Sequence, residues 1–442
     1  MTRAGTCADV AIEQLGARGD GIARLGDGNV FVALALPGDR LTVRLGARRE
    51  GGFAAEPVTW HHQAPRAGPH CPHFGACGGC QLQHLPPSEL AVWQCAQVEA
   101  ALARRGLAAC PIEPAQAMPP ATRRRARIAF QRRGRQVVLG FRGRAAHQIT
   151  DVEACALVVP EILALLPPLR TALAELPLAG QGGEVLVTAT ESGLDLVVLA
   201  SPEPVLRDRE GIAALADAQD LARVSWQARV ADAPEVMVRR RPVRVTFGGI
   251  AVEPPPGAFL QATLEAEAQI RTAVGAAIGP ALGQGGRLAD LYAGCGTFAL
   301  PLAAAGHQVQ AIEVDAGMVA ALSAAARTAG LGPRLSAVAR DLARAPLAGA
   351  ELAGLDAVIL DPPRAGAKTQ AKMLAGSEVG RIAMVSCNPA SFARDARTLV
   401  DGGYHLAAVR LIDAFLWSAQ IELVATFCRR SHVERRSAKF GA

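Results

Sequence analysis

A cysteine between an apolar run and a proline is the first candidate for chemistry in this sequence. Residues 382–385 are apolar and predict a short buried strand, which ends at Ser386-Cys387-Asn388-Pro389 because proline donates no hydrogen bond to a sheet. Cys387 therefore follows the carboxyl end of a strand, where open α/β sheets bind their ligands. Free cysteines are more often small buried hydrophobes than nucleophiles, so a role for Cys387 depends on the rest of the chain.

Three more cysteines, in the pattern C-x5-C-x2-C, form a candidate metal site. Cys71, Cys77 and Cys80 are separated by glycines that let the backbone wrap around a ligand. A fourth thiolate must come from elsewhere; Cys155 is our candidate, with Cys95 and Cys110 as alternatives. Four thiolates suit zinc or an iron–sulfur cluster, and ligand chemistry alone does not separate the two.

Polar residues follow four predicted strands in the last part of the chain. A strand at 287–292 leads into a G-x-G turn, and the three later strands end at or just before a carboxylate. The glycines let a ligand approach the backbone, and a carboxylate about twenty residues further on is placed to meet ribose hydroxyls. The pattern predicts a nucleotide-type pocket lined by Gly294, Gly296, Glu313, Asp341 and Asp361.

Two other enzyme classes share parts of this pattern. A dinucleotide dehydrogenase has the fingerprint G-x-G-x-x-G, but Ala299 takes the third glycine position, and neither Asp361-Pro-Pro-Arg364 nor Ser386-Cys387-Asn388-Pro389 has a place in hydride transfer. Adenine methyltransferases use a similar Asp-Pro-Pro motif to hold an amino group, although an Asp before two prolines commonly only caps a turn. Their amino nitrogen attacks directly and needs no thiol, so Cys387 argues against that class.

Length and composition bound the elements that position these residues. A chain of 442 residues is too long for one core and should form two or three domains. Half of the residues are hydrophobic, but no run approaches the roughly 18 apolar residues of a membrane span. The first residues lack the apolar core of a signal peptide, so we expect a cytoplasmic protein without membrane contacts.

The order of the predicted elements suggests three domains. Residues 1–60 contain short β-rich runs at 10–12, 29–32 and 40–43, separated by glycine turns, and predict an OB-like β-barrel. Residues 61–255 predict a small α+β domain that holds the cysteine pattern, with helices at 88–105 and 158–175. Residues 256–442 alternate helix and strand, which predicts an α/β, doubly wound parallel sheet.

Arginines are concentrated in the middle of the chain. No acidic residue occurs between Glu113 and Asp151, and the interval contains Arg123, Arg124, Arg125, Arg127, Arg132, Arg133, Arg135, Arg142 and Arg144. Solvated faces normally mix charges of both signs. The run therefore predicts a track for a polyanion such as RNA.

Taken together, these motifs resemble the RNA uracil-C5 (5-methyluridine) methyltransferases. Within that family the sequence is most similar to the 23S ribosomal RNA enzymes that carry an N-terminal TRAM barrel and a 4Fe-4S cluster. The resemblance covers nearly the whole chain except its last dozen residues. It rests on the four cysteines, Phe259-Leu-Gln261, Asp290-Leu-Tyr-Ala-Gly294-Cys-Gly296, Asp361-Pro-Pro-Arg364 and Ser386-Cys387-Asn388-Pro389.

The family implies a class I, Rossmann-like methyltransferase domain that binds S-adenosylmethionine. The matching cofactor positions are Gln261, Tyr292, Gly294, Gly296, Glu313, Asp341 and Asp361. It also implies a 4Fe-4S cluster on Cys71, Cys77, Cys80 and Cys155 and an RNA substrate, with 23S ribosomal RNA expected and no obligate protein partner. One departure is Thr263, where the family often has Asn.

The family's mechanism gives Cys387 a role as nucleophile. A thiolate adds to carbon 6 of uracil so that carbon 5 can accept a methyl group, and a carboxylate then removes the carbon 5 proton. A free thiol is only a few per cent ionised at neutral pH, so we expect the site to favour the thiolate. We choose Glu422 as the base because it enters the β run 423–427, and we treat Glu434, in a basic tail, as coincidental. Gln420 departs from the family's His.

Two alternatives remain open at the level of sequence. The substrate could be the T-loop of transfer RNA, because the barrel and the cysteines favour ribosomal RNA only through the family resemblance. The chain could also be a non-catalytic RNA-binding protein, although Cys387 and Glu422 argue against that. Which uridine is modified is not encoded in a residue pattern, because RNA shape selects it.

Overall fold

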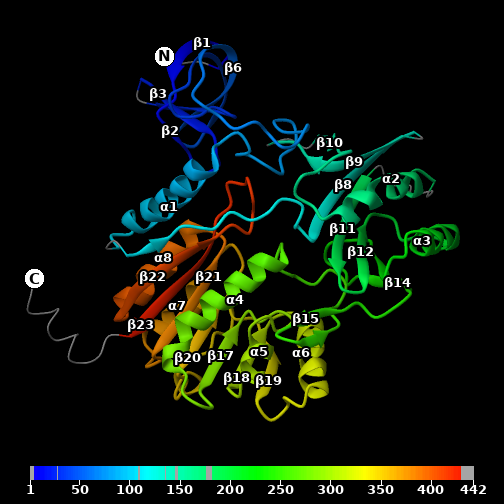
Figure 1. Cartoon of the computed structure of the whole chain (residues 1–442), viewed down its shortest axis with the longest axis vertical. Helices are drawn as coiled ribbons and strands as arrows, with labels where there is room; N and C mark the ends of the chain where they lie inside the picture. The colour runs from blue at the N-terminus through cyan, green and yellow to red at the C-terminus, as the bar shows by residue number, and fades with distance from the viewer. Residues whose placement is uncertain are drawn as a thin grey trace, which may run out of the picture.

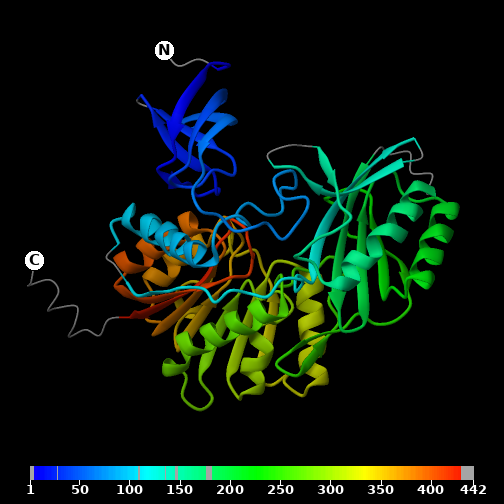
Figure 2. The same ribbon diagram turned by 45° about the horizontal axis from the view of Figure 1, so that its top comes forward.

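Three β-sheets, with helices packed on two of them, make up most of the molecule (Figure 1). The structure is a computed structural model, and it describes residues 4–26, 28–107, 110–134, 136–144, 148–175 and 182–429. Figure 2 shows the N-terminal sheet standing above the other two, with the central and C-terminal sheets side by side below it. Among the described residues, no helix is long and apolar enough to cross a membrane.

The N-terminal sheet has six strands in the order β1-β5-β6-β4-β3-β2. Its inward residues, such as Val30, Val32 and Leu41, are fully buried, as expected for strands with one face on a core. The predicted β runs overlap β1, β4 and β5, whereas the TRAM identity of this unit stays a prediction. The strands are β1 (Cys7–Ala11), β2 (Gln14–Leu15), β3 (Gly21–Leu25), β4 (Gly28–Val32), β5 (Arg40–Arg49) and β6 (Gly52–His62).

The central sheet has seven strands in the order β10-β9-β8-β11-β12-β13-β14, antiparallel except for the pair β12–β13. The helices α2 (Pro160–Glu175) and α3 (Leu206–Ala218) share its core. Apolar runs at 128–130, 137–141, 184–190, 194–200 and 243–247 predict strands, and each overlaps a strand of the structure. The predicted run that starts at His147 begins outside the described residues. The strands are β8 (Arg125–Arg133), β9 (Gln136–Arg142), β10 (Ile149–Asp151), β11 (Gly182–Thr190), β12 (Gly193–Leu199), β13 (Arg223–Gln227) and β14 (Glu235–Arg239), followed by the hairpin β15 (Val245–Phe247) and β16 (Ile250–Val252).

The C-terminal sheet has the order β19-β18-β17-β20-β21-β23-β22-β7. The run from β19 to β21 is parallel, and β23 and β22 add antiparallel strands beside β21. The predicted alternation of helix and strand is therefore confirmed. The strands are β17 (Arg287–Leu291), β18 (Gln308–Glu313), β19 (Leu335–Ala339), β20 (Ala357–Leu360), β21 (Arg381–Ser386), β22 (Tyr404–Ile412) and β23 (Glu422–Arg429).

Helices cover both faces of this sheet (Figure 1). Successive residues of a strand point to opposite faces, so Met384 packs with one helix layer and Val385 with the other. One layer consists of α7 (Lys368–Ala375), α8 (Pro389–Asp401) and α1 (Pro87–Ala103); the other consists of α4 (Leu264–Ile278), α5 (Ala299–Ala304) and α6 (Ala316–Thr328). Short 3-10 turns occur at Gly279–Ala281 and Gly349–Glu351.

The segment between the first two sheets packs on the third. Leu90 and Trp93 of α1 lie in the same core as Phe392 of α8, and β7 (Ile112–Glu113) pairs with β22 at the sheet's edge. The predicted unit 61–255 thus includes a stretch that belongs by packing to the C-terminal sheet. Apolar burial decides this, because the apolar face of α1 finds its partner on α8 rather than on the central sheet.

Candidate active site

Cys387 occupies the turn between β21 and α8. The side chain of Asn388 caps the helix by accepting a hydrogen bond from the backbone N–H of Ala390 at 3.0 Å, and Pro389 is the first helical residue. Pro389 thus begins a helix in addition to ending a strand. The thiol is only partly buried at the carboxyl end of the sheet, where a substrate can reach it.

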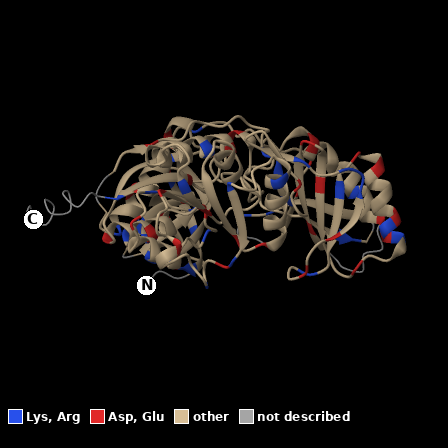
Figure 3. Cartoon of the chain, turned by 90° about the horizontal axis from the view of Figure 1, so that it is seen from below, with Lys and Arg blue, Asp and Glu red and all other residues tan. Residues whose placement is uncertain are grey.

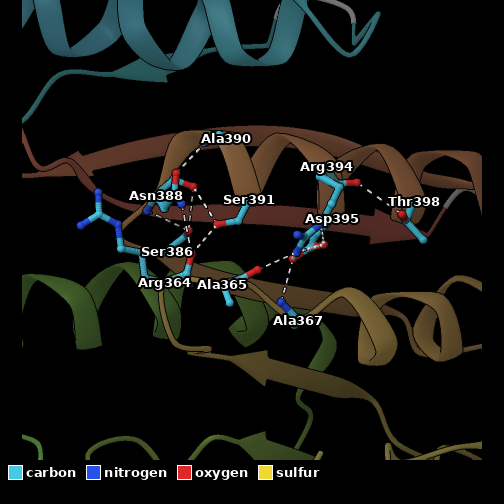
Figure 4. A network of polar contacts seen from close by, with 10 residues as sticks. All are labelled: Arg364, Ala365, Ala367, Ser386, Asn388, Ala390, Ser391, Arg394, Asp395 and Thr398. Carbon is cyan, nitrogen blue, oxygen red and sulfur yellow. Dashed lines mark hydrogen bonds and ion pairs between the residues drawn. The ribbon is translucent and has the colours of Figure 1, made fainter. Parts of the chain in front are cut away.

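The Asp361-Pro-Pro-Arg364 loop is fastened to this turn (Figure 4). The backbone carbonyl of Arg364 accepts hydrogen bonds from Asn388 Nδ2 at 3.1 Å and from Ser391 Oγ at 3.0 Å. Asp395 of α8 accepts a hydrogen bond from the N–H of Ala367 at 2.7 Å, which holds the far end of the same loop. The two motifs, which lie more than twenty residues apart in the sequence, therefore form one connected structure.

The register of β23 puts Glu422 next to Cys387. Ser386 lies opposite Leu423 in the antiparallel pair β21–β23, so the residue before Leu423 adjoins the residue after Ser386. Glu422 is buried, with 5% of its surface exposed. Burial raises the pKa of Glu422 well above its usual value, and the neighbouring carboxylate of Asp361 raises it further. Glu434 lies outside the described residues.

The expectation that the site favours the Cys387 thiolate is wrong for the protein alone. Burial raises the pKa of Cys387, and the carboxylates of Glu422 and Asp361 raise it further, while the guanidinium of Arg364 lowers it. A cationic ligand near these carboxylates would offset much of the increase that they cause in the pKa of Cys387.

Carboxylates gather at the carboxyl ends of β17, β18 and β20. Burial raises the pKa of Asp290 to about 8, and the charges of Asp361 and Glu313 add to the shift. Burial, with Glu313 as a further contributor, raises the pKa of Asp361 to about 7. The side chain of Gln261, from the segment before α4, donates to Asp361 Oδ2 at 3.4 Å. These residues are close enough to affect each other's ionisation.

The predicted G-x-G turn is tied to the end of the next strand. Glu313 accepts a hydrogen bond from the N–H of Gly294 at 3.0 Å and others from Val314 and Asp315. Gly296 has a φ of +98°, and a Cβ there would lie 2.4 Å from Leu322, so only glycine fits. The turn therefore keeps the backbone clear for a ligand.

Tyr292 and Asp341 lie at the same edge of the sheet. Burial raises the pKa of Tyr292 to about 12, and the charges of Asp395, Asp341 and Glu313 contribute. Asp341 follows β19 and accepts a hydrogen bond from the N–H of Ala343 at 2.9 Å. All seven predicted cofactor positions therefore lie in or before turns at one edge of the sheet.

Cys71, Cys77, Cys80 and Cys155 line a single cavity of about 950 Å³. Burial raises the pKa of Cys80 to about 12, and the charges of Cys155, Cys77 and Cys71 contribute. Across the residues that the structure describes, no group of three or more His, Cys, Asp or Glu side chains is arranged to hold a metal ion. The donor set is nevertheless gathered around one space, and thiolate sulfur suits iron or zinc.

The alternative cysteines lie elsewhere. Cys95 and Cys110 pack against the core of the C-terminal sheet, and both feel the charge of Glu99 in α1 rather than that of the other thiols. Cys155 is therefore the fourth cysteine that lines the same cavity as Cys71, Cys77 and Cys80.

The prediction of an uncompensated arginine track is wrong for four of its members. Arg124 is buried against Glu267 at 2.6 Å, Arg127 and Arg142 both pair with Glu184, and Arg144 pairs with Asp20 of the N-terminal sheet. In Figure 3 the acidic residues, coloured red on the ribbon, and the basic ones, coloured blue, are mixed across the central sheet. The sequence could not show this, because the counter-charges come from distant parts of the chain; Arg135 lies outside the described residues.

Comparison with known proteins agrees with this arrangement. Residues 256–430 match the family model described as tRNA (Uracil-5-)-methyltransferase. An uncharacterized RNA methyltransferase of Mesorhizobium japonicum is 41% identical over 94% of this chain and 96% of its own length. The 23S rRNA (uracil(1939)-C(5))-methyltransferase RlmD of Chromohalobacter salexigens is 34% identical over 96% of this chain and 90% of its own.

A solved structure shares the fold along almost the whole chain. The tRNA (uracil-54, C5)-methyltransferase of Pyrococcus abyssi, in complex with S-adenosyl-L-homocysteine, superposes with a TM-score of 0.73 at 21% identity, covering 95% of this chain and 99% of that one. The family model and the two relatives confirm the resemblance found in the motifs. The chain belongs to the RNA uracil-C5 methyltransferase family.

Proposed function

We propose that this protein transfers a methyl group from S-adenosylmethionine to carbon 5 of a uridine in 23S ribosomal RNA. The observation that carries the proposal is the strand register that sets Glu422 beside Cys387 at the carboxyl end of the sheet. The choice of ribosomal over transfer RNA is supported by the 34% identity to a named 23S rRNA enzyme along nearly the full length.

In the proposed reaction, Cys387 is the nucleophile and Glu422 the general base. The Cys387 thiolate adds to carbon 6 of the uracil and leaves an enolate whose carbon 5 takes the methyl group. Glu422 then removes the proton from carbon 5, the bond between sulfur and carbon 6 breaks, and the thiolate leaves as the ring double bond re-forms. A raised pKa makes Glu422 a stronger base once it is ionised.

The carboxylate-rich pocket is the proposed place for the methyl donor. S-adenosylmethionine supplies the methyl group and is cationic at its sulfonium and amino groups. Asp290, Asp361 and Glu313 are neighbours whose ionisation a bound cation would favour. We assign Gln261, Tyr292 and Asp341 to the same pocket, because they lie at the same edge of the sheet.

We further propose that Cys71, Cys77, Cys80 and Cys155 hold a 4Fe-4S cluster. The support is the shared cavity together with the family resemblance. Anaerobically purified protein should contain iron and acid-labile sulfide in equal amounts, and Cys155→Ser should lose both. Cys95→Ser and Cys110→Ser are matched controls that should keep them. Zinc in place of iron, or an unaffected Cys155→Ser variant, would reject the assignment.

Mass mapping of RNA tests the function as a whole. Ribosomal and transfer RNA from cells with and without the gene should differ by one 5-methyluridine in 23S RNA; a loss from transfer RNA instead would move the substrate to the T-loop. Cys387→Ala should abolish methylation. Glu422→Gln should accumulate a covalent protein–RNA adduct on a denaturing gel, and if Glu434→Gln does so instead, the base is misassigned.

A further inference from the structure

The loop in front of the proposed base is held by the cysteine-rich segment. Residues 413–421 connect β22 to β23, and the loop ends directly at Glu422. Trp417, near its middle, has a φ of +57°, a left-handed conformation that a bulky residue adopts only where its surroundings enforce it. The loop is thus held in an unfavourable backbone conformation, and contacts from outside the loop must stabilise it.

Gln81 supplies that support through two hydrogen bonds to the loop. Its backbone N–H donates to the carbonyl of Trp417 at 3.0 Å, and its side-chain oxygen accepts from the N–H of Ala419 at 3.2 Å. Its side-chain nitrogen donates to the carbonyl of Gly78 at 2.5 Å, which fixes the amide orientation. One residue therefore holds the loop at two points, Trp417 and Ala419. Ala419 lies three residues before Glu422.

Neighbouring residues reinforce the clamp. The N–H of Leu82 donates to the same Trp417 carbonyl at 2.9 Å, and Leu82 itself is fully buried in the core of the C-terminal sheet. The ring of His70 stacks on Trp417 with centroids 4.7 Å apart and an angle of 15° between planes. The segment around Cys71, Cys77 and Cys80 is thus connected directly to the loop that enters β23.

We propose that the side chain of Gln81 positions Glu422: through its bond to Ala419 it fixes the end of the loop 413–421 so that the carboxylate meets the carbon 5 proton. This inference rests on the proposed function of Glu422. Gln81 does not touch the substrate in this account. Its loss therefore affects the step that Glu422 performs, namely proton removal and release, and leaves addition of Cys387 and methyl transfer intact.

Gln81→Met tests the proposal, because it keeps the volume and removes the amide. Proton transfer depends on a correctly placed base, so we expect release to slow by about tenfold or more. A covalent protein–RNA adduct that already carries the methyl group should accumulate on a denaturing gel. Replacing the carbon 5 hydrogen by deuterium should then slow turnover more in the variant than in the wild type.

Two further variants separate positioning from general damage. Gln81→Glu keeps an oxygen that can accept from Ala419, so it should accumulate less adduct than Gln81→Met. Gln370→Met removes another side-chain amide, which is fully buried and bonds both the N–H and the carbonyl of Leu347 in a different part of the fold. It should lower stability without accumulating adduct.

The results distinguish failure of this inference from failure of the proposed function. If Glu422→Gln accumulates methylated adduct while Gln81→Met shows none and an unchanged isotope effect, only the positioning role is refuted. If Gln370→Met accumulates as much adduct as Gln81→Met, the effect is general destabilisation, and the positioning role is again refuted. If Glu422→Gln accumulates none, the base is wrongly assigned and the inference falls with it.

Discussion

Replacing Asp290 by asparagine should stabilise the protein at alkaline pH while weakening its hold on the methyl donor. Asp290 has no exposed surface, and neither carboxylate oxygen has a hydrogen-bond partner among the described residues, although the N–H of Ala299 is near enough to favour the charged form slightly. A buried, unpaired carboxylate is unfavourable to ionise. A carboxylate at position 290 therefore lowers the stability of the fold, and we explain its presence by a function.

The sign and size of the effect follow from the raised pKa. Burial and the neighbouring Asp361 and Glu313 shift the pKa of Asp290 from 3.8 to about 8, so the folded protein keeps this proton after the unfolded chain has lost it. Stability therefore falls as the pH rises from the unfolded value to the folded one. At about 1.4 kcal/mol per pH unit, the wild type should lose as much as about 3 kcal/mol between about pH 5.5 and pH 8.

Thermal unfolding across this pH range, without the methyl donor, measures the difference. The advantage of Asp290→Asn over the wild type should grow with pH. Asp356→Asn, which changes an exposed carboxylate at the opposite end of the sheet, is the matched control and should leave the slope unchanged. Calorimetry should show that S-adenosylmethionine binds the wild type more tightly as the pH rises, and that Asp290→Asn shallows this trend. An equal slope in both proteins would refute the reasoning.

Three further predictions concern single contacts. Arg124→Met should lower the free energy of unfolding by about 2–4 kcal/mol in chemical denaturation, because Glu267 stays buried with only Arg271 beside it. The double variant Arg124→Met with Glu267→Met should recover most of the lost stability. A double variant as unstable as Arg124→Met would contradict this prediction. Gly296→Ala should weaken cofactor binding and lower stability more than Gly294→Ala. An added Cβ at Gly296 would lie 2.4 Å from Leu322, whereas a Cβ at Gly294 would meet nothing within 4 Å. Similar shifts in the melting temperature of the two variants would argue against this. Arg364→Met should slow alkylation of Cys387 by iodoacetamide, because it removes the cation that lowers the pKa of Cys387, and Arg364→Lys should restore much of the rate.

The C-terminal sheet was predictable because its strands carry their signal locally. Each parallel strand is a short apolar run that ends in a polar residue, and the helices between them fix the order. The preference for Glu422 over Glu434 also used local information, since only Glu422 enters a β run. The β run 423–427 did not indicate which strand it would pair with. Its antiparallel pairing with β21 places Glu422 beside Cys387.

The error about the arginines arose because contacts between distant residues leave no local signal. Nine arginines without an adjacent acid looked uncompensated, yet Glu184, Glu267 and Asp20 reach four of them across the fold. The Asn388-Pro389 pair was interpreted as the end of a strand, although an N-cap residue followed by proline is also a helix start, and that signal was in the sequence. For Gln81 and Trp417 the sequence contains no comparable signal.

The arrangement of the three sheets suggests why a methyltransferase domain needs the others. A uracil must leave its stack before a thiol can reach carbon 6, at a cost of a few kcal/mol that the active site alone is poorly placed to offset. The cavity of the four cysteines is lined by Phe31 and Arg49 of the N-terminal sheet, by Arg123 at the start of the central sheet, and by Arg364 of the C-terminal one. Arg364 is also the cation that lowers the pKa of Cys387. The cation that lowers the pKa of Cys387 thus lies on a cavity wall to which all three units contribute.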